Sequence, residues 1–214
     1  MPDEASVQTS LTLLSRIEAE GDDDAWSVFT RLYGPLVYAW CRSAGLQPDD
    51  VDNVGQEVFR VVVQKIGTFQ PNRKPSGAFR SWLWGVTRLQ ILNHLRAAKR
   101  QPVGKGGTDH HLSLQRLEQE SQEPENVGGV TSRQLLAQSA IGVLQAEFDP
   151  RTWQAFWDLA VKGRSAKDIG DELDMTAKAV RQAKFRVTKK LRELLGEDSV
   201  GIDGVDVPPL NPQD

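Results

Sequence analysis

Apolar residues recur every three or four positions along most of this 214-residue chain, and no other feature restricts its fold as strongly. This spacing places apolar side chains on one face of a helix, whereas a half-buried strand would alternate apolar and polar residues. The region 25–44 shows the pattern clearly, and its stripe consists of Trp26, Phe29, Leu32, Tyr33, Leu36, Val37 and Trp40. We therefore predict an all-α protein.

The same pattern predicts the bounds of the individual helices. After a short amphipathic segment, Ser10–Glu20, helices are expected at Ala25–Ala44, Val51–Ile66, Ala78–Arg100, Ser132–Glu147, Arg151–Val161, Ser165–Leu173 and Thr176–Leu195. Pro35 lies inside the first of these longer helices, where a proline can kink or break it. The apolar side of the helix at 78–100 is expected to contain Phe79, Trp82, Leu83, Val86, Leu89 and either Leu92 or Leu95.

Changes in composition divide the chain into two helical domains. Residues 101–130 contain glycines at 104, 106, 107, 128 and 129, a cluster of acids and few large apolar side chains, which is typical of a flexible linker. We expect an N-terminal segment at 1–24, a first domain at 25–100, this linker, and a smaller second domain at 131–195. The tail at 196–214 contains three prolines and is expected to be disordered.

The net charge of −3 conceals two basic stretches. Residues 73–108 contain no acid and eight lysines or arginines, and residues 176–195 contain seven basic residues against Glu193 alone. Acids gather elsewhere, above all at 22–24, 49–52 and 118–125. Because the distribution of charge matters more for association than its sum, two basic faces indicate two contacts with nucleic acid.

Other classes of protein are disfavoured by what the sequence lacks. No run approaches the roughly 20 apolar residues of a membrane span, and residues 1–10 lack the order of a signal peptide. We therefore expect a cytoplasmic protein without membrane insertion. Cys41 is the only cysteine and lies in an apolar stretch, so we expect a buried, unreactive thiol. His94, His110 and His111 have no acidic partner at metal-ligand spacing, and no glycine loop has phosphate-binding spacing. No catalytic residue, metal or cofactor is expected.

The most specific local pattern lies at the end of the second domain. Ser165 can cap one helix, residues 173–175 form a short turn, and Thr176 can cap the next helix. Ala166 and Gly170 are small where two helices must cross closely. This arrangement predicts a helix-turn-helix whose second helix enters the major groove of DNA.

The outward face of that second helix carries side chains suited to DNA. Arg181 and Gln182 can make bidentate contacts to guanine and adenine edges, while the basic residues that follow suit phosphates. The predicted DNA contacts of this helix are Thr176, Lys178, Arg181, Gln182, Lys184, Phe185, Arg186 and Lys189.

One motif in the first domain resembles a segment of the sigma factors of bacterial RNA polymerase. Residues 53–59, Asn-Val-Gly-Gln-Glu-Val-Phe, are similar to the family's Asp-x-x-Gln-Glu/Asp-x-Phe, with Asn53 in place of the acid and Gly55 in place of a larger residue. In the family this segment grips the clamp helices of the polymerase. The resemblance implies a polymerase contact through Asp52, Asn53, Gln56, Glu57 and Arg60.

A second motif in the same domain, Phe-Arg-Ser-Trp-Leu-Trp at 79–84, resembles the family's Phe-x-x-Trp-Leu and is followed by a basic helix end at 95–100. In the family this helix and the loop before it recognise and melt the minus-10 element, where exposed rings can stack on unpaired bases. Helical spacing puts Trp82 on the core side and Trp84 nearer the exposed side. The resemblance implies minus-10 contacts through Asn72, Arg73, Arg80, Trp84, Arg88, Asn93 and Arg96.

Residues 148–195 resemble the domain with which the same family reads the minus-35 element. The chain lacks the long intermediate domain of primary sigma factors, so the resemblance is to the small extracytoplasmic-function type. It implies a promoter-recognition subunit with core RNA polymerase and promoter DNA as partners. Many relatives are also held by an anti-sigma factor, which no residue here identifies, and the sequence names neither the promoter nor the inducing signal.

One other function stays open on the sequence alone. A different helix-turn-helix regulator needs only the C-terminal pattern, and the motifs at 53–59 and 79–100 would then be coincidental. Stable association with core polymerase separates this alternative from a sigma factor. An enzyme is disfavoured, because the candidate catalytic groups are few and scattered. An RNA-binding or adaptor role for the basic stretches is equally disfavoured.

Overall fold

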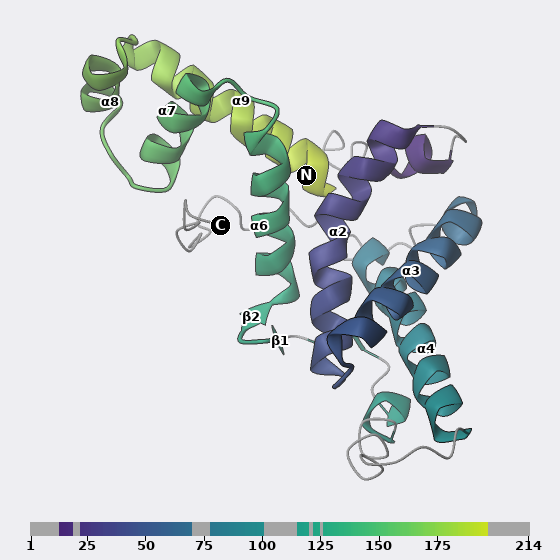
Figure 1. The fold of residues 1–214 in the computed structure, drawn as a ribbon. Coiled ribbons are helices and arrows are strands. Elements are labelled where there is room, and N and C mark those ends of the chain that lie inside the picture. Colours follow the sequence, from purple (N-terminus) through teal and green to yellow (C-terminus); the bar gives the residue numbers. More distant parts are fainter. Residues whose placement is uncertain are drawn as a thin grey trace. The chain divides into compact units, whose positions relative to one another are not determined.

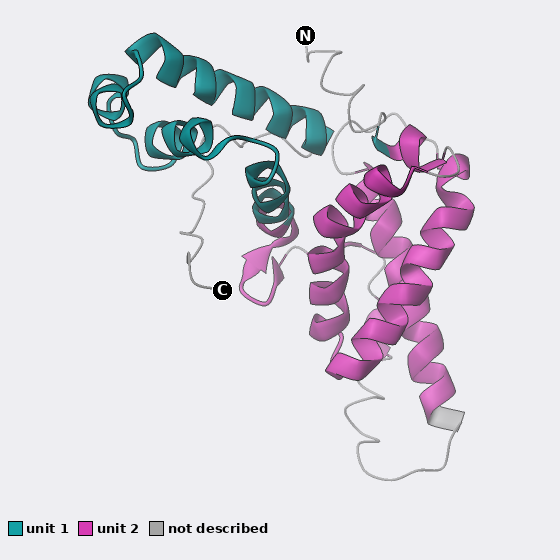
Figure 2. Ribbon diagram, turned by 45° about the horizontal axis from the view of Figure 1, so that its top comes forward, with its two compact units in different colours: residues 1–13, 136–214 teal, residues 14–135 magenta. Residues whose placement is uncertain are grey.

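The computed structural model describes residues 13–18, 22–69, 78–100, 115–119, 122–124 and 126–196. The elements, mostly helical, are α2 (Asp23–Ser43), α3 (Pro48–Lys65), the 3-10 helix η1 (Ile66–Thr68), α4 (Ala78–Arg100), β1 (Asn126–Val127), β2 (Val130–Thr131), α6 (Ser132–Gln145), α7 (Pro150–Ala160), α8 (Ala166–Leu173) and α9 (Ala177–Leu195) (Figure 1). Packing divides the chain into two compact units, residues 14–135 and residues 1–13 with 136–214 (Figure 2).

The predicted helix bounds are close to those observed, and the largest shift is at the start of α3. That helix begins at Pro48 rather than Val51, because proline is tolerated in the first turn of a helix. At the start of α2 the Asp22 side chain accepts a hydrogen bond from the Ala25 amide at 2.8 Å. This helix runs through Pro35 without a break. Residues 13–18 of the segment expected at 10–20 are helical, whereas the rest of that segment and the tail after Gly196 lie outside the described residues.

The all-α prediction needs one correction. Strands β1 and β2 pair antiparallel, with Asn126 opposite Thr131 and Val127 opposite Val130, inside the segment expected to be a linker. Gly128 and Gly129 form the turn with φ of 63° and 92°. Two consecutive residues with positive φ are what a tight hairpin requires, and glycine adopts them without strain. The glycine pair therefore marks a hairpin and not only a flexible linker.

Helices α2, α3 and α4 form the core of the first unit. The stripe predicted on α2 is buried from Phe29 to Trp40, whereas Trp26 is half-buried and stacks on Phe29 at a ring-centroid distance of 5.3 Å. Cys41 is buried as expected, and this burial raises the pKa of its thiol to about 12.

The buried face of α4 differs from the predicted one. Trp84 is 1% exposed and Trp82 half-buried, the reverse of the expectation, and Leu89 is 48% exposed. Thr87 lies in the core instead, where its hydroxyl donates to the carbonyl oxygen of Leu83 at 2.8 Å and so is satisfied without water. The buried residues of this helix are Phe79, Leu83, Trp84, Thr87, Ile91, Leu92 and Leu95.

The end of the expected linker is fixed to the first unit. The Trp40 indole donates to the Ser132 hydroxyl at 3.3 Å, and that hydroxyl donates to the carbonyl oxygen of Pro124 at 3.2 Å. Ser132 is buried. The hairpin and the first turn of α6 therefore pack with the rest of residues 14–135, and the division between the two compact units falls inside α6.

Candidate nucleic-acid and polymerase interface

Two capped helices and a tight turn form the pattern expected near the C-terminus. The Ser165 hydroxyl accepts a hydrogen bond from the Asp168 amide at 3.1 Å, and the Thr176 hydroxyl accepts one from the Ala179 amide at 3.1 Å. Between the helices, Asp174 has a φ of 51°, a left-handed conformation that aspartate visits more readily than most residues. The predicted caps and turn are confirmed.

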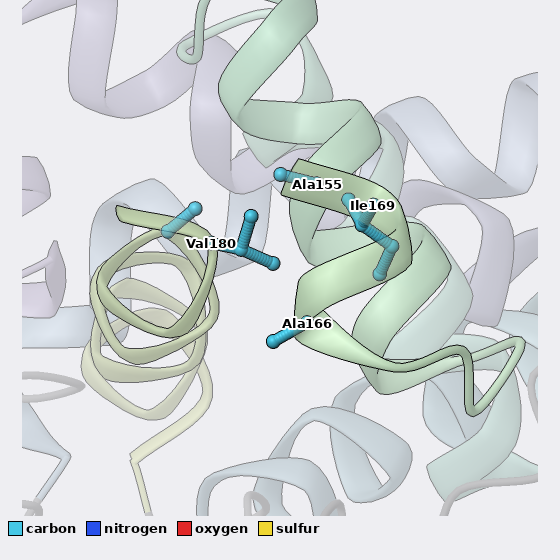
Figure 3. Packing of buried hydrophobic residues seen from close by; sticks show 5 residues of the cluster. Ala155, Ala166, Ile169 and Val180 are labelled. Carbon is cyan, nitrogen blue, oxygen red and sulfur yellow. The ribbon is translucent and has the colours of Figure 1, made fainter. Parts of the chain in front are cut away.

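A small apolar core joins α7, α8 and α9. Its buried members are Ala155, Ala166, Ile169, Val180 and Ala183 (Figure 3). The partly buried residues packed against them are Leu159, Leu173, Met175 and Ala177. Gly170 of α8 lies against the turn, and a Cβ atom there would be 2.5 Å from the Met175 carbonyl oxygen. The helix and the turn can approach this closely only because the residue is glycine.

Gly170→Ala is expected to destabilise this unit by about 1–2 kcal/mol. The clash with a backbone atom costs about 1–3 kcal/mol, and the better helix propensity of alanine returns up to about 1 kcal/mol. Urea denaturation followed by circular dichroism measures the change. Gly142→Ala in α6 is the matched control, because its added Cβ would meet no atom within 4 Å beyond its own helix backbone and chain neighbours. If both variants gained stability equally, the tight packing at Gly170 would be refuted.

A buried carboxylate ties α7 to α8. The Asp158 side chain is 2% exposed, and its oxygens lie 2.8 Å from Lys162 Nζ and 2.9 Å from an Arg164 guanidinium nitrogen. The same guanidinium lies 2.5 Å from a Glu172 oxygen on α8. Burial acts most strongly on the Asp158 pKa and would raise it, but hydrogen bonds with Lys162 and Gln154 and the Arg164 charge together hold it below its ordinary value. No residue pattern in the sequence predicted this network.

The outward face of α9 is basic and exposed. All of the side chains predicted to contact DNA there are exposed, and Phe185 is 67% exposed. Arg186 lies 3.4 Å from the Thr152 hydroxyl, and Lys189 lies 3.9 Å from Glu193. A projecting helix with Arg181 and Gln182 near its start has the chemistry to read base edges in a major groove.

The polar face of α3 lies beside a shallow groove, which Asp52 and Gln56 line. Asp52, Asn53, Gln56 and Arg60 are exposed, while Glu57 is half-buried and lies 3.2 Å from the Arg60 guanidinium. This ion pair is open to solvent, so it contributes little to stability and is available to a partner. The groove has a volume of about 300 Å³ and is lined by Gly34, Val37, Tyr38, Val51, Asp52, Gly55, Gln56 and Phe59. Such a surface can receive a helix of another protein.

Trp84 needs a correction as a minus-10 candidate. Its buried ring contacts Trp40 edge to face at a centroid distance of 5.5 Å, so in this conformation it cannot stack on a base. Asn72 and Arg73 lie outside the described residues, and Asn93 is exposed.

Three arginines of α4 that are predicted DNA contacts also interact with the segment expected to be a linker. Arg80 Nε lies 2.7 Å from both carboxylate oxygens of Glu123. Arg88 donates to the carbonyl oxygens of Leu117 and Glu118 at 2.7 and 3.0 Å. Arg96 lies 2.8 Å from a carboxylate oxygen of Glu118. None of these contacts could be found from sequence, since the partners are 22 to 43 positions apart.

The sequence is similar to a known protein family and to a known protein. Residues 29–101 match the sequence model of the Sigma-70 region 2 family, a segment that contains most of α2 and all of α3 and α4. Over 189 residues the chain is 25% identical to the RNA polymerase sigma factor CnrH of Cupriavidus metallidurans. The alignment covers 87% of this chain and 95% of CnrH, so it extends over both units.

Proposed function

Since this chain is an RNA polymerase sigma factor with a sigma-70 region 2 domain, we propose that it directs promoter-specific initiation as a small factor of the extracytoplasmic-function type. The observation that carries the proposal is the occurrence, in one chain, of the region 2 match and of a capped, exposed basic helix in the other unit. Sigma factors are not enzymes, so the chemistry of RNA synthesis belongs to the polymerase.

Core RNA polymerase is proposed to bind the exposed face of α3. The residues assigned to this contact are Asp52, Asn53, Gln56, Glu57 and Arg60. Asp52 and Gln56 line the groove over Gly55, where the absence of a side chain leaves room for a partner residue. A mixed polar rim around an apolar centre is the usual anatomy of such a contact.

The DNA contacts are proposed to lie on two helices. Helix α9 is assigned to the minus-35 major groove, with Arg181 and Gln182 reading bases and its lysines positioning the helix on phosphates. Helix α4 is assigned to the minus-10 strand through Arg80, Arg88, Asn93 and Arg96, together with the loop residues Asn72 and Arg73. Two weak contacts on one chain reinforce each other through effective concentration.

The proposed role also bears on where the protein is located in the cell and on whether an anti-sigma factor binds it. In the part of the chain that the structure describes, no helix is long and apolar enough to cross a membrane. A cytoplasmic protein is proposed, as promoter binding requires. An anti-sigma factor stays a candidate partner, and no residue is assigned to it.

Run-off transcription with purified core polymerase tests the proposal. On a library that includes the upstream region of its own gene, the protein is expected to produce transcripts with defined starts that core polymerase alone does not make. Sequence-specific DNA binding by the protein alone, without polymerase binding and without transcripts, would instead indicate a conventional helix-turn-helix regulator.

Gln56→Ala is expected to weaken binding to core polymerase roughly fivefold, equivalent to about 1 kcal/mol for one interface hydrogen bond. Fluorescence anisotropy with labelled protein and core enzyme measures this change. Gln64→Ala, an equally exposed substitution on the same helix, is the control and should leave the dissociation constant unchanged. Equal effects of the two substitutions would argue against the α3 face as the contact.

A further inference from the structure

One segment of the chain covers the side chains of α4 that the proposed function assigns to DNA. It consists of the helical turn at 115–119 and residues 122–124. Three arginines of α4 contact it: Arg80 through Glu123, Arg88 through two backbone carbonyls, and Arg96 through Glu118. One segment therefore contacts all three arginines that are both described by the structure and proposed to bind the minus-10 strand.

The contacts differ in how firmly they are held. The Arg80 and Glu123 side chains are only 14% and 11% exposed, and Leu117 is buried. Glu123 and Leu117 therefore anchor the segment on α4. Arg96 and Glu118 are about half exposed, so their ion pair is open to solvent and weak. The segment is thus fixed through Glu123 and Leu117, whereas the ion pair between Glu118 and Arg96 is loosely held.

A carboxylate and a phosphate compete for the same donors. Both accept charge-assisted hydrogen bonds from a guanidinium group, and an arginine already paired to a carboxylate has fewer donors left for DNA. The negative charges of Glu118 and Glu123 also repel the DNA backbone from this face. Each contact displaced by a phosphate must be broken first, which lowers the net affinity for DNA.

We propose that the segment formed by residues 115–119 and 122–124 acts as an acidic cover over α4, and that full affinity for the minus-10 strand requires its release. The inference rests on the proposed function, because it takes the α4 arginines as phosphate contacts. It assigns to the acidic part of the expected linker a second role beyond joining the two units. The isolated chain then binds single-stranded DNA weakly, and uncovering α4 increases this binding.

Glutamine at Glu118 and Glu123 removes the two carboxylate charges that contact α4 and keeps side chains of nearly the same shape. The Glu118→Gln/Glu123→Gln protein is expected to bind a fluorescein-labelled single-stranded oligonucleotide of mixed sequence about three- to tenfold more tightly than the wild type. Its affinity should also fall more steeply with salt, by about 0.7 in the log–log slope for each additional phosphate that the protein neutralises on a single strand. Anisotropy titrations over a range of salt concentrations measure both quantities.

Matched variants separate the cover from a general change in charge. Asp24→Asn removes an exposed acid at the start of α2, and we expect less than a twofold change from it. Adding Arg96→Gln to the double variant should remove part of the increase in affinity. Glu118→Gln alone breaks only the solvent-exposed pair, so it reports on the cover even if Glu123→Gln disturbs folding, which circular dichroism detects.

Two outcomes would overturn the inference: unchanged affinity in the double variant and in Glu118→Gln, or an increase no larger than that of Asp24→Asn. The proposed function is judged separately by run-off transcription of the wild type. Defined transcripts together with unchanged DNA affinity would reject the cover and keep the sigma factor. Tighter DNA binding by the double variant, without any transcript from the wild type, would support a cover over a nucleic-acid-binding face. It would also reject the proposal that the protein initiates transcription.

Discussion

Alanine at both Arg181 and Gln182 is expected to abolish initiation at promoters that depend on a minus-35 element, while binding to core polymerase is retained. Both side chains are exposed near the start of α9, which is capped by Thr176. Each bidentate contact to a base contributes about 1–3 kcal/mol to discrimination. Loss of both contacts therefore reduces the binding free energy by about 2–6 kcal/mol, which lowers promoter affinity roughly 30-fold to more than 10⁴-fold.

The measurement is run-off transcription on a promoter identified with the wild type, beside a titration of core polymerase with the variant. Lys189→Ala is the informative contrast, because a phosphate contact should weaken binding to all sequences by a similar factor. Initiation by the double variant at the wild-type start with wild-type strength would show that α9 does not read this promoter. Loss of core binding as well would point to misfolding instead.

Local chemistry explains why the helix pair α8 and α9 could be predicted closely. Its caps, Ser165 and Thr176, hydrogen-bond to amides three residues away, so each signal is contained within one turn of sequence. The need for glycine at position 170 is also local, since the atom that a Cβ would meet belongs to Met175 in the turn that follows. The exposed residues of α9 follow directly from the helix period once the buried stripe is identified.

The orientation of α4 could not be predicted in the same way. Apolar side chains occur on several sides of this helix, so its spacing alone does not select one buried face. The face is decided by tertiary contacts, above all the packing of Trp84 on Trp40, and by Thr87, whose hydroxyl is satisfied within the helix. The pairing of Arg80 with Glu123 likewise requires the path of the chain between them. The distribution of charge in the sequence therefore predicts a basic stretch on this helix, but not which residues its arginines contact.

Asp158→Asn is expected to destabilise the unit of α7, α8 and α9 by about 1–3 kcal/mol, because hydrogen bonds between charged groups are lost at a buried position. The remaining Lys162 and Arg164 are partly exposed and can be solvated, which keeps the loss below that of a fully buried pair. Urea denaturation, with amide hydrogen exchange in α8 and α9, assigns the change to this unit. Glu172→Gln removes only the exposed end of the network and should cost less than about 1 kcal/mol.

The effect of Asp158→Asn should depend on pH in a defined direction. The pKa of Asp158 is lower in the folded chain than in the unfolded chain, so the ionised carboxylate stabilises the fold. This contribution is complete above the ordinary aspartate pKa of about 3.9 and declines as the pH falls through the lower folded value. Wild type and variant should therefore differ fully at neutral pH and converge below about pH 4. A stability difference that stayed constant into this acid range would mean that packing at position 158, and not the carboxylate charge, holds α7 against α8.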